Sequence, residues 1–161
     1  MAVIYMERSL LDGLTEADIK KIVDENSGGD KYGKLQDYYE GKHDILQYTK
    51  KDRTAPNNRI VNNMAKYVTD TATGYFLGQP VVYSSQNTAF LEAVQVFFEY
   101  GEEQDEKAEL AKGMSIGGNY MEMLYMDENA QIRFAPVSPS NCIMIYETGA
   151  LEPMAAVRIV D

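Results

Sequence analysis

Residues 56–83 read PNNRIVNNMAKYVTDTATGYFLGQPVVY and place a helix start, an amphipathic helix, a helix stop and a short strand in one uninterrupted stretch. Asn57 and Asn58 follow a proline and offer side-chain oxygens that can accept hydrogen bonds from the first free N–H groups of a helix. We therefore expect a helix that begins near Arg59 and joins the early part of the chain to a later sheet.

The apolar side chains of this helix recur about every four residues and form a stripe that can be buried. The stripe consists of Ile60, Val61, Met64, Ala65, Val68, Ala72, Tyr75 and Phe76. Gly78 is expected to end the helix, and Pro80 blocks its continuation. Gly74 costs a helix about 1 kcal/mol relative to alanine, which indicates close approach by a neighbouring backbone. Asn62 and Asn63 are poor helix formers and are expected to hydrogen-bond a neighbouring loop or subunit.

Capping and turn residues divide the rest of the chain into further elements. Helices are expected at residues 16–25, at residues 30–40, between Asn87 and Gly101, and from Glu102 to about residue 115. Strands are expected at residues 81–83, 119–126, 131–137, 142–147 and 154–160, with a hairpin loop at 127–130. A turn is expected at residues 26–29 and an exposed loop at 47–56.

Two helix faces carry packing expectations. The helix after Asn87 has an apolar face that we expect to be core. Its members are Phe90, Leu91, Val94, Phe97 and Phe98. The next helix has a stripe of small residues that allows tight packing against a neighbour. Its members are Ala108, Ala111 and Ser115.

Helices that precede a mostly antiparallel sheet define an α+β fold. A chain of 161 residues has the size of one domain. We therefore expect a single α+β domain over residues 1–161. Within it, residues 1–55 form a helical arm and loop, residues 56–118 a helical core, and residues 119–161 a β-hairpin and further strands.

Composition limits the classes of function. The net charge of −10 argues against ordinary DNA binding, because lysine and arginine supply most non-specific affinity for phosphate. A channel through which DNA slides would instead benefit from weak contact, and solubility alone would also explain the charge. No apolar run approaches the ~20 residues of a membrane span, so we expect a soluble protein without a secretory signal. The single cysteine, Cys142, is expected to be a small buried hydrophobe.

Three sequence blocks follow one another in the chain. They are Tyr-Tyr-x-Gly-x-His-x-Ile at residues 38–45, Asn-Asn-Arg-Ile-x-x-Asn at residues 57–63, and Gly-Tyr-x-x-Gly-x-Pro-Val-x-Tyr at residues 74–83. In this order they resemble the portal proteins of tailed bacteriophages. The helix that ends at residues 115–119 and runs into residues 120–127 is similar to the next block of that family. The resemblance covers about residues 10–160.

The resemblance implies a structural protein of the virion, without catalytic residues, cofactor or metal. A portal subunit forms a dodecameric ring at one capsid vertex, through which DNA is packaged and ejected and to which the tail connector attaches. The implied partners are other copies of the full-length subunit, the terminase, capsid and scaffolding proteins, and the head–tail adaptor. Double-stranded DNA would pass the channel with little contact from this chain, and no membrane is involved. The implied location is the portal vertex, after assembly in the bacterial cytoplasm.

The resemblance also singles out residues that carry the motifs and are offered as subunit contacts. They are Tyr38, Tyr39, Gly41, Asn57, Asn58, Arg59, Asn63, Gly74, Tyr75, Gly78, Pro80 and Tyr83. Family members are several times longer than this chain, so the resemblance implies an N-terminal piece that contains the wing. Residues 154–161 read as a strand without a closing turn, as expected for a truncated clone, a split gene or a prophage remnant.

Two other functions stay open. A standalone binding module derived from a portal would be a folded monomer that never joins rings. A small hydrolase would need His43, the only histidine, although a capping or surface role suits its position after Gly41 better. The carboxylates at residues 102–109 are expected to be a solvated helix face instead of an acid/base pair.

Overall fold

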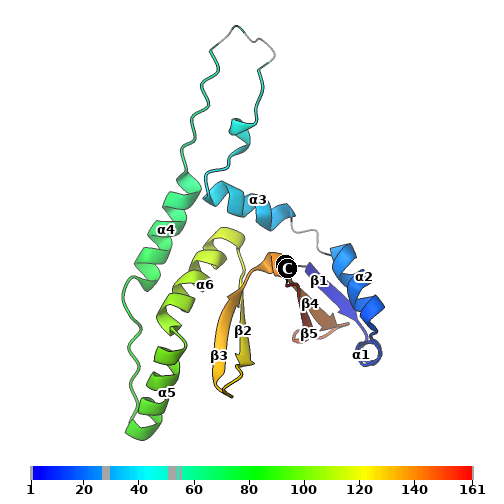
Figure 1. Ribbon diagram of the computed structural model, residues 1–161, viewed down its shortest axis with the longest axis vertical. Coiled ribbons are helices and arrows are strands. Elements are labelled where there is room, and N and C mark those ends of the chain that lie inside the picture. Colours follow the sequence, from blue (N-terminus) through cyan, green and yellow to red (C-terminus); the bar gives the residue numbers. More distant parts are fainter. Residues whose placement is uncertain (1, 27–29, 51–53, 55, 161) are drawn as a thin grey trace.

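The computed structural model describes residues 2–26, 30–50, 54 and 56–160, and its fold is α+β as predicted (Figure 1). Its helices are α1 (Arg8–Leu11), α2 (Glu16–Asn26), α3 (Asp30–Tyr39), α4 (Met64–Leu77), α5 (Thr88–Tyr100) and α6 (Glu103–Gly117). Its strands are β1 (Ala2–Met6), β2 (Met121–Met126), β3 (Ile132–Val137), β4 (Cys142–Glu147) and β5 (Pro153–Arg158). Single turns of 3-10 helix are η1 (Asp44–Leu46) and η2 (Pro139–Asn141).

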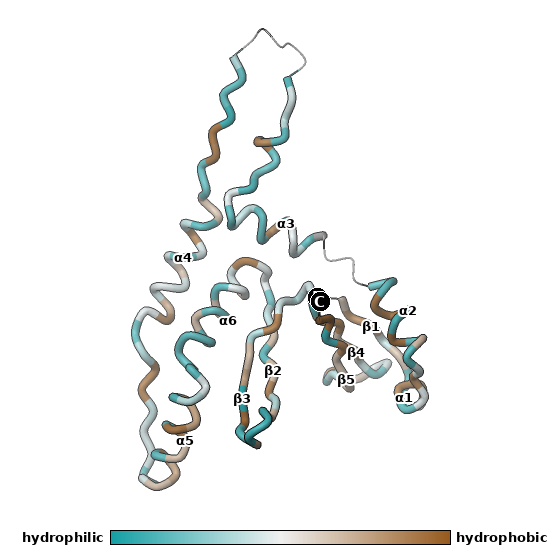
Figure 2. Tube along the Cα trace, in the orientation of Figure 1, coloured by the Kyte–Doolittle hydropathy of each residue, from teal (hydrophilic) through white to brown (hydrophobic). Residues whose placement is uncertain are grey.

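The strands form two separate sheets. β2 and β3 make the predicted antiparallel hairpin, and β4 pairs antiparallel with β5. β1 was not predicted, and it pairs in parallel with the other edge of β4, with Ala2 opposite Ile143. Ile143 and Ile145 are almost fully buried, and Figure 2 shows the hydrophobic character of β1 and β4. β1 escaped prediction because five residues give little periodicity, and its partner lies near the other end of the chain.

The elements form two groups joined across α3 (Figure 1). One group holds α4, α5, α6 and the β2–β3 hairpin, and the other holds β1, β4 and β5 with α1 and α2. Between α3 and α4 the described residues make two limbs that project from the rest of the molecule. We call residues 44–50 the outgoing limb and residues 56–62 the returning limb.

Several predicted elements are confirmed. The helix predicted at 16–25 is α2, and Thr15 and Asp18 exchange the side-chain and backbone hydrogen bonds of a capping box. Asn87 caps α5 by accepting from the Phe90 N–H at 3.1 Å. Cys142 is buried, and burial raises the pKa of its thiol. Of the turn predicted at 26–29 and the loop predicted at 47–56, residues 27–29, 51–53 and 55 lie outside the described residues.

The predicted start of the central helix is wrong. α4 begins at Met64, and Asn63 is its N-cap, whose side chain accepts a hydrogen bond from the Lys66 N–H at 3.0 Å. Residues 56–62 have no regular structure, so Asn57 and Asn58 cap nothing. The helix starts after Asn63 because, at the N-cap, the asparagine side-chain oxygen accepts a hydrogen bond from the backbone. Inside the helix the same side chain would compete with the helical backbone hydrogen bonds.

The predicted core face of this helix is also wrong, because it faces outward. Val68 and Phe76 are exposed, Phe76 by 76%. α4 instead turns Thr69 toward α6, where Thr69 is only 5% exposed and accepts a hydrogen bond from the Ser115 hydroxyl at 3.4 Å. The stripe of small residues predicted to favour tight packing thus lies on α6, which packs beside α4, and Thr69 contacts Ser115 of that stripe.

Two smaller expectations fail as well, and a third is confirmed only in part. Residues 81–83 form no strand, because no described strand lies beside them to pair with. A Cβ added at Gly74 would meet nothing within 4 Å, so no neighbouring backbone approaches closely. The core face expected on α5 is confirmed only in part, because Phe90 is exposed whereas Phe97 packs against the core residue Phe134 with ring centroids 5.6 Å apart. Gly78 does end α4, as predicted.

Gly101 and Gly74 give opposite predictions for substitution by alanine. A Cβ at Gly101 would lie 2.6 Å from a ring carbon of Phe134, a core residue. Gly101→Ala should therefore lower the free energy of unfolding by about 1–3 kcal/mol through overpacking. Gly74→Ala should raise it by up to about 1 kcal/mol, because the position is helical and open. Urea unfolding of both variants checks this, and an unchanged Gly101→Ala variant would contradict the described packing.

Candidate functional site

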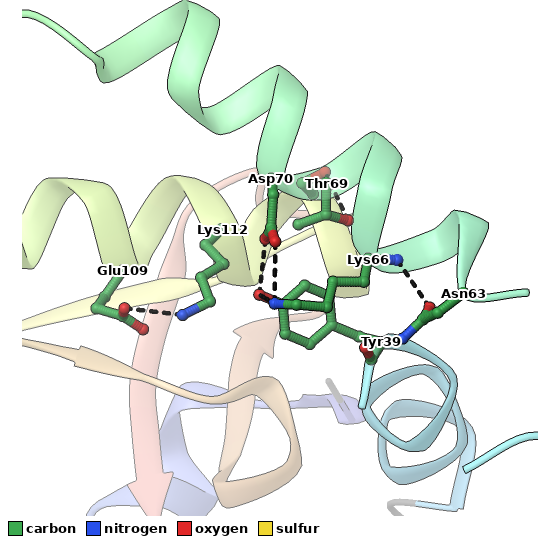
Figure 3. A network of polar contacts seen from close by, with 8 residues as sticks. Tyr39, Asn63, Lys66, Thr69, Asp70, Glu109 and Lys112 are labelled. Carbon is green, nitrogen blue, oxygen red and sulfur yellow. Dashed lines mark hydrogen bonds and ion pairs between the residues drawn. The ribbon is translucent and has the colours of Figure 1, made fainter. Parts of the chain in front are cut away.

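A polar cluster holds the base of the two limbs (Figure 3). The Tyr39 hydroxyl donates to Asp70 Oδ1 at 2.8 Å, and Lys66 Nζ lies 2.9 Å from Asp70 Oδ2 and 3.1 Å from the Tyr39 hydroxyl oxygen. The hydrogen bond with Lys66 holds the pKa of Asp70 below its usual range, and the same bond raises the pKa of Lys66. This Tyr39 cluster fastens the end of α3 to the first turns of α4.

Two motif blocks meet in this cluster. The Asn63 amide donates to the Tyr39 carbonyl oxygen at 2.8 Å while its oxygen caps α4. Gly41 adopts φ +84°, and a Cβ there would lie 3.3 Å from Asn63 Nδ2. Because only glycine tolerates that backbone at little cost, Gly41 lets the chain leave α3 beside Asn63. The expected hydrogen bond of Asn63 to a neighbouring segment is therefore confirmed.

Beside this cluster, His43 and Tyr38 stack with ring centroids 4.7 Å apart. Asp44, the nearest acid in sequence, accepts a hydrogen bond from the Tyr38 hydroxyl at 3.0 Å and pairs with Lys34 at 3.1 Å. Nε2 of His43 is buried and makes no hydrogen bond with the described residues. A hydrolase would need a carboxylate to orient this imidazole, and Asp44 instead serves Lys34 and Tyr38.

A second cluster surrounds Tyr83, the last residue of the third motif. Its hydroxyl donates to Glu103 and accepts from Lys107, which also pairs with Glu103, and its ring lies 4.9 Å from that of Phe98. Burial alone would raise the pKa of Glu103, but hydrogen bonds from Lys107 and Tyr83 hold it below its usual value. Glu103 is buried, so the prediction of a solvated acidic face is wrong at this position.

The other motif residues lie on the surface or end a helix. Arg59 donates through Nη1 to the Leu46 carbonyl oxygen and thereby ties the returning limb to the outgoing limb. Gly78 ends α4. Those that are exposed to solvent are Asn57, Asn58, Gly74, Tyr75 and Pro80.

The partners of the motif residues were missed in the sequence. Lys66 with Asp70, and Glu103 with Lys107, are opposite charges four residues apart on one helix. That spacing is a recognised signal for a side-chain pair, and it marks the charged half of each cluster. Their tyrosine partners come from distant segments, which spacing alone does not reveal.

One apolar face of α4 is not buried by the described residues. We call it the open face of α4. Its members are Met64, Tyr67, Val68, Tyr75 and Phe76, all exposed. Contiguous exposed apolar side chains mark an interaction surface in soluble proteins.

The described part of the chain offers neither a membrane-spanning helix nor a cluster of metal ligands. No helix there combines the length and hydropathy that a membrane crossing requires. Groups of three or more metal-binding side chains were not found among the same residues.

The polar clusters fasten segments of the chain together, and the open face of α4 has the character of a surface for interaction with another chain. The sequence places the chain more narrowly. Residues 20–161 match the family model described as phage portal protein, SPP1 Gp6-like, and the chain belongs to this family. The resemblance predicted from the three motifs is therefore confirmed. A comparison with curated protein sequences found no match.

Asn63 should be the most sensitive position of the Tyr39 cluster. Asn63→Ala removes both the helix cap and the bond to Tyr39, and should lower the free energy of unfolding by about 1–3 kcal/mol. Asn63→Asp keeps the cap and loses only the donor, so its cost should be smaller. Asn62→Ala, at an exposed neighbour, should stay within about 0.5 kcal/mol. Urea unfolding measures all three, and a neutral Asn63→Ala variant would contradict the assignment.

Glu103 should make stability depend on pH. Its folded pKa lies below the unfolded value of 4.5, so its contribution is complete above pH 4.5 and is lost as the pH falls through the folded pKa. Glu103→Gln should cost about 1–3 kcal/mol at pH 7, because it leaves Lys107 without its partner. The difference from the parent chain should shrink at pH 3.

Urea unfolding at both pH values tests this dependence. Glu102→Gln is the matched control, because Glu102 is an exposed neighbour and forms no ion pair with the described residues. An equal difference between Glu103→Gln and the parent at pH 7 and pH 3 would count against the ion pair.

Proposed function

We propose that this chain is part of a portal subunit, in a dodecameric ring at one capsid vertex through which DNA is packaged and ejected. Membership of the portal family supports the structural role. In this proposal residues 1–161 are one α+β domain of a longer subunit. The head–tail adaptor, the terminase, and capsid and scaffolding proteins are its partners, and DNA passes with little contact from this acidic chain.

The observation that carries the proposal is the open face of α4. Tyr75 is 95% exposed, and Phe76 and Val68 lie beside it on the same helix. Burying one such side chain contributes about 1.5–3 kcal/mol. Another chain that packs against this face would therefore be held there by a favourable free energy. A neighbouring subunit is the cover that we propose, because the family supplies a structural role and the described residues supply no cover.

The motif residues then divide into two roles. Tyr39, Asn63 and Tyr83 hold segments of this chain together through the clusters described above. Tyr75 lies on the open face, and we propose it as a contact with the next subunit. The exposed residues of the returning limb, Asn57 and Asn58, are proposed as further contacts.

Phe76→Ser tests the open face. We expect the 161-residue chain to be a monomer in equilibrium with low-order oligomers at tens of micromolar. Losing one buried aromatic contact should weaken this association at least about tenfold. Because Phe76 is exposed in the single chain, the free energy of unfolding at low concentration should hardly change. Sedimentation velocity over a concentration series measures the association.

Leu151→Ser is the matched control, since Leu151 is exposed in the turn between β4 and β5, away from α4. It should leave association unchanged. A chain that stays monomeric at all concentrations would favour the standalone binding module and count against the ring subunit.

A further inference from the structure

A surface groove lies where residues 81–83 pass the junction of α5 and α6. It encloses about 720 Å³, with Val82 and Phe98 among its apolar walls. Its unpaired carboxylates are those of Glu99, Glu102 and Asp105, which form no ion pair with the described residues. No lysine or arginine is among the described residues that line it. We call it the Val82 groove, and it suits a ligand that is both apolar and basic.

The backbone along this groove lies outside the helices and strands and makes no hydrogen bond to another described backbone group. Val81 and Val82 are exposed, Val82 by 89%, whereas the ring of Tyr83 packs on Phe98. No backbone group of residues 80–84 hydrogen-bonds to another described backbone group. Unpaired backbone of this kind is a template for a strand from another chain.

The returning limb has the complementary properties. It lies outside any helix or strand, and Ile60 is 82% exposed. Arg59 is the cation of this limb and donates to the neutral carbonyl oxygen of Leu46. Lys50, at the end of the outgoing limb, donates to the Pro56 carbonyl oxygen and so lies beside the returning limb. No described carboxylate pairs with either cation. Figure 2 shows one hydrophobic segment in the otherwise hydrophilic trace of each limb.

A chain cannot place this limb in its own groove. α4 separates the two, and its 14 residues span about 21 Å. The limbs project from the N-terminal end of α4, whereas residues 81–83 follow its C-terminal end (Figure 1). The partner that combines these features is therefore a second copy of the chain.

We propose that the returning limb of one copy docks in the Val82 groove of another copy. Its backbone pairs with residues 81–83, Ile60 covers Val82, and Arg59, with Lys50 beside it, approaches the groove's carboxylates. Each copy offers one limb and one groove, so the contact is heterologous and repeats from copy to copy. This inference shares with the proposed function the assumption that copies of the chain associate. The proposed function does not require the docking, because the open face of α4 could join copies by itself.

Cysteine crosslinking tests the docking directly. Ile60→Cys and Val82→Cys are made in separate chains, which are mixed with a short bismaleimide. Both positions are exposed, so neither substitution disturbs the fold of the single chain. The native Cys142 stays in place because it is buried and burial raises the pKa of its thiol, which suppresses reaction. The unaltered chain measures any background.

We expect heterodimer from this mixture at a yield at least about tenfold above that of Ile60→Cys mixed with Leu151→Cys, because docking raises the effective concentration. Leu151 is the matched control, being exposed on the other group of elements. A yield equal to that control would overturn the proposal.

Charge reversal provides a second test. Glu99→Lys in the Val82→Cys chain should lower the crosslinking yield several-fold, because it places a cation where Arg59 docks. High salt should also lower the yield, because it screens the attraction between Arg59 and the carboxylates. A lysine at position 99 also suits the C-terminal end of α5, so the chain stays folded. Glu92→Lys, on the same helix but outside the groove, makes the same change in charge and should leave the yield unaltered. Equal yields from the two variants would contradict the charge match.

The competing outcomes are distinguishable. If copies associate in the ultracentrifuge while crosslinking stays at the control level, the docking is wrong and the proposed function stands. If copies do not associate at all, both fail. If a fluorophore at Ile60→Cys reports binding of a short DNA duplex and crosslinking is absent, the limb binds nucleic acid and the docking is wrong.

Discussion

The packing of α4 on α6 determines which surface the protein presents. Thr69 is buried at this contact and accepts a hydrogen bond from Ser115. Small side chains let two helix backbones approach closely, and once the threonine side of α4 is turned inward, helical geometry turns the apolar side outward. The open face of α4 is thus a consequence of which side of the helix packs inside the chain.

The Tyr39 cluster holds the N-terminal end of α4 in place. Asn63 caps α4 and holds the Tyr39 carbonyl, so the helix begins where the chain returns from the limbs. The ion pair of Lys66 and Asp70 is exposed, and such pairs contribute little on their own. Their value here is geometric, because both contact the Tyr39 hydroxyl and so orient α3 against α4.

The sequence predicted what local chemistry decides, and failed where tertiary contacts decide. The helix expected at residues 16–25, the helix start at Asn87 and the β2–β3 hairpin depend on neighbouring residues, and all three predictions are confirmed. The start of α4 was placed too early because two asparagine pairs competed for it and only the contact with Tyr39 selects Asn63. The apolar stripe of α4 was assigned to the core because its periodicity shows a face suited to burial. Periodicity does not show whether that face is buried within the same chain or against another one. Glu103 and Lys107 lie four residues apart, a spacing that signals a side-chain pair, but they were not predicted as one, and their contact with Tyr83 spans too much sequence to be predicted.

The free energy available from burying the open face can be compared with the free-energy cost of bringing two chains together. Five side chains of this size would contribute on the order of 10 kcal/mol if fully buried. Bringing two chains together costs an estimated 4–15 kcal/mol, so a single contact of this kind is weak. A chain that is stable alone and associates strongly only in a closed assembly needs such a contact on two sides, because in a ring each copy meets two neighbours. In the docking proposed above, the returning limb and the Val82 groove are that second set of surfaces. Weak association of the single chain and firm association in a ring would then both follow from the same contacts.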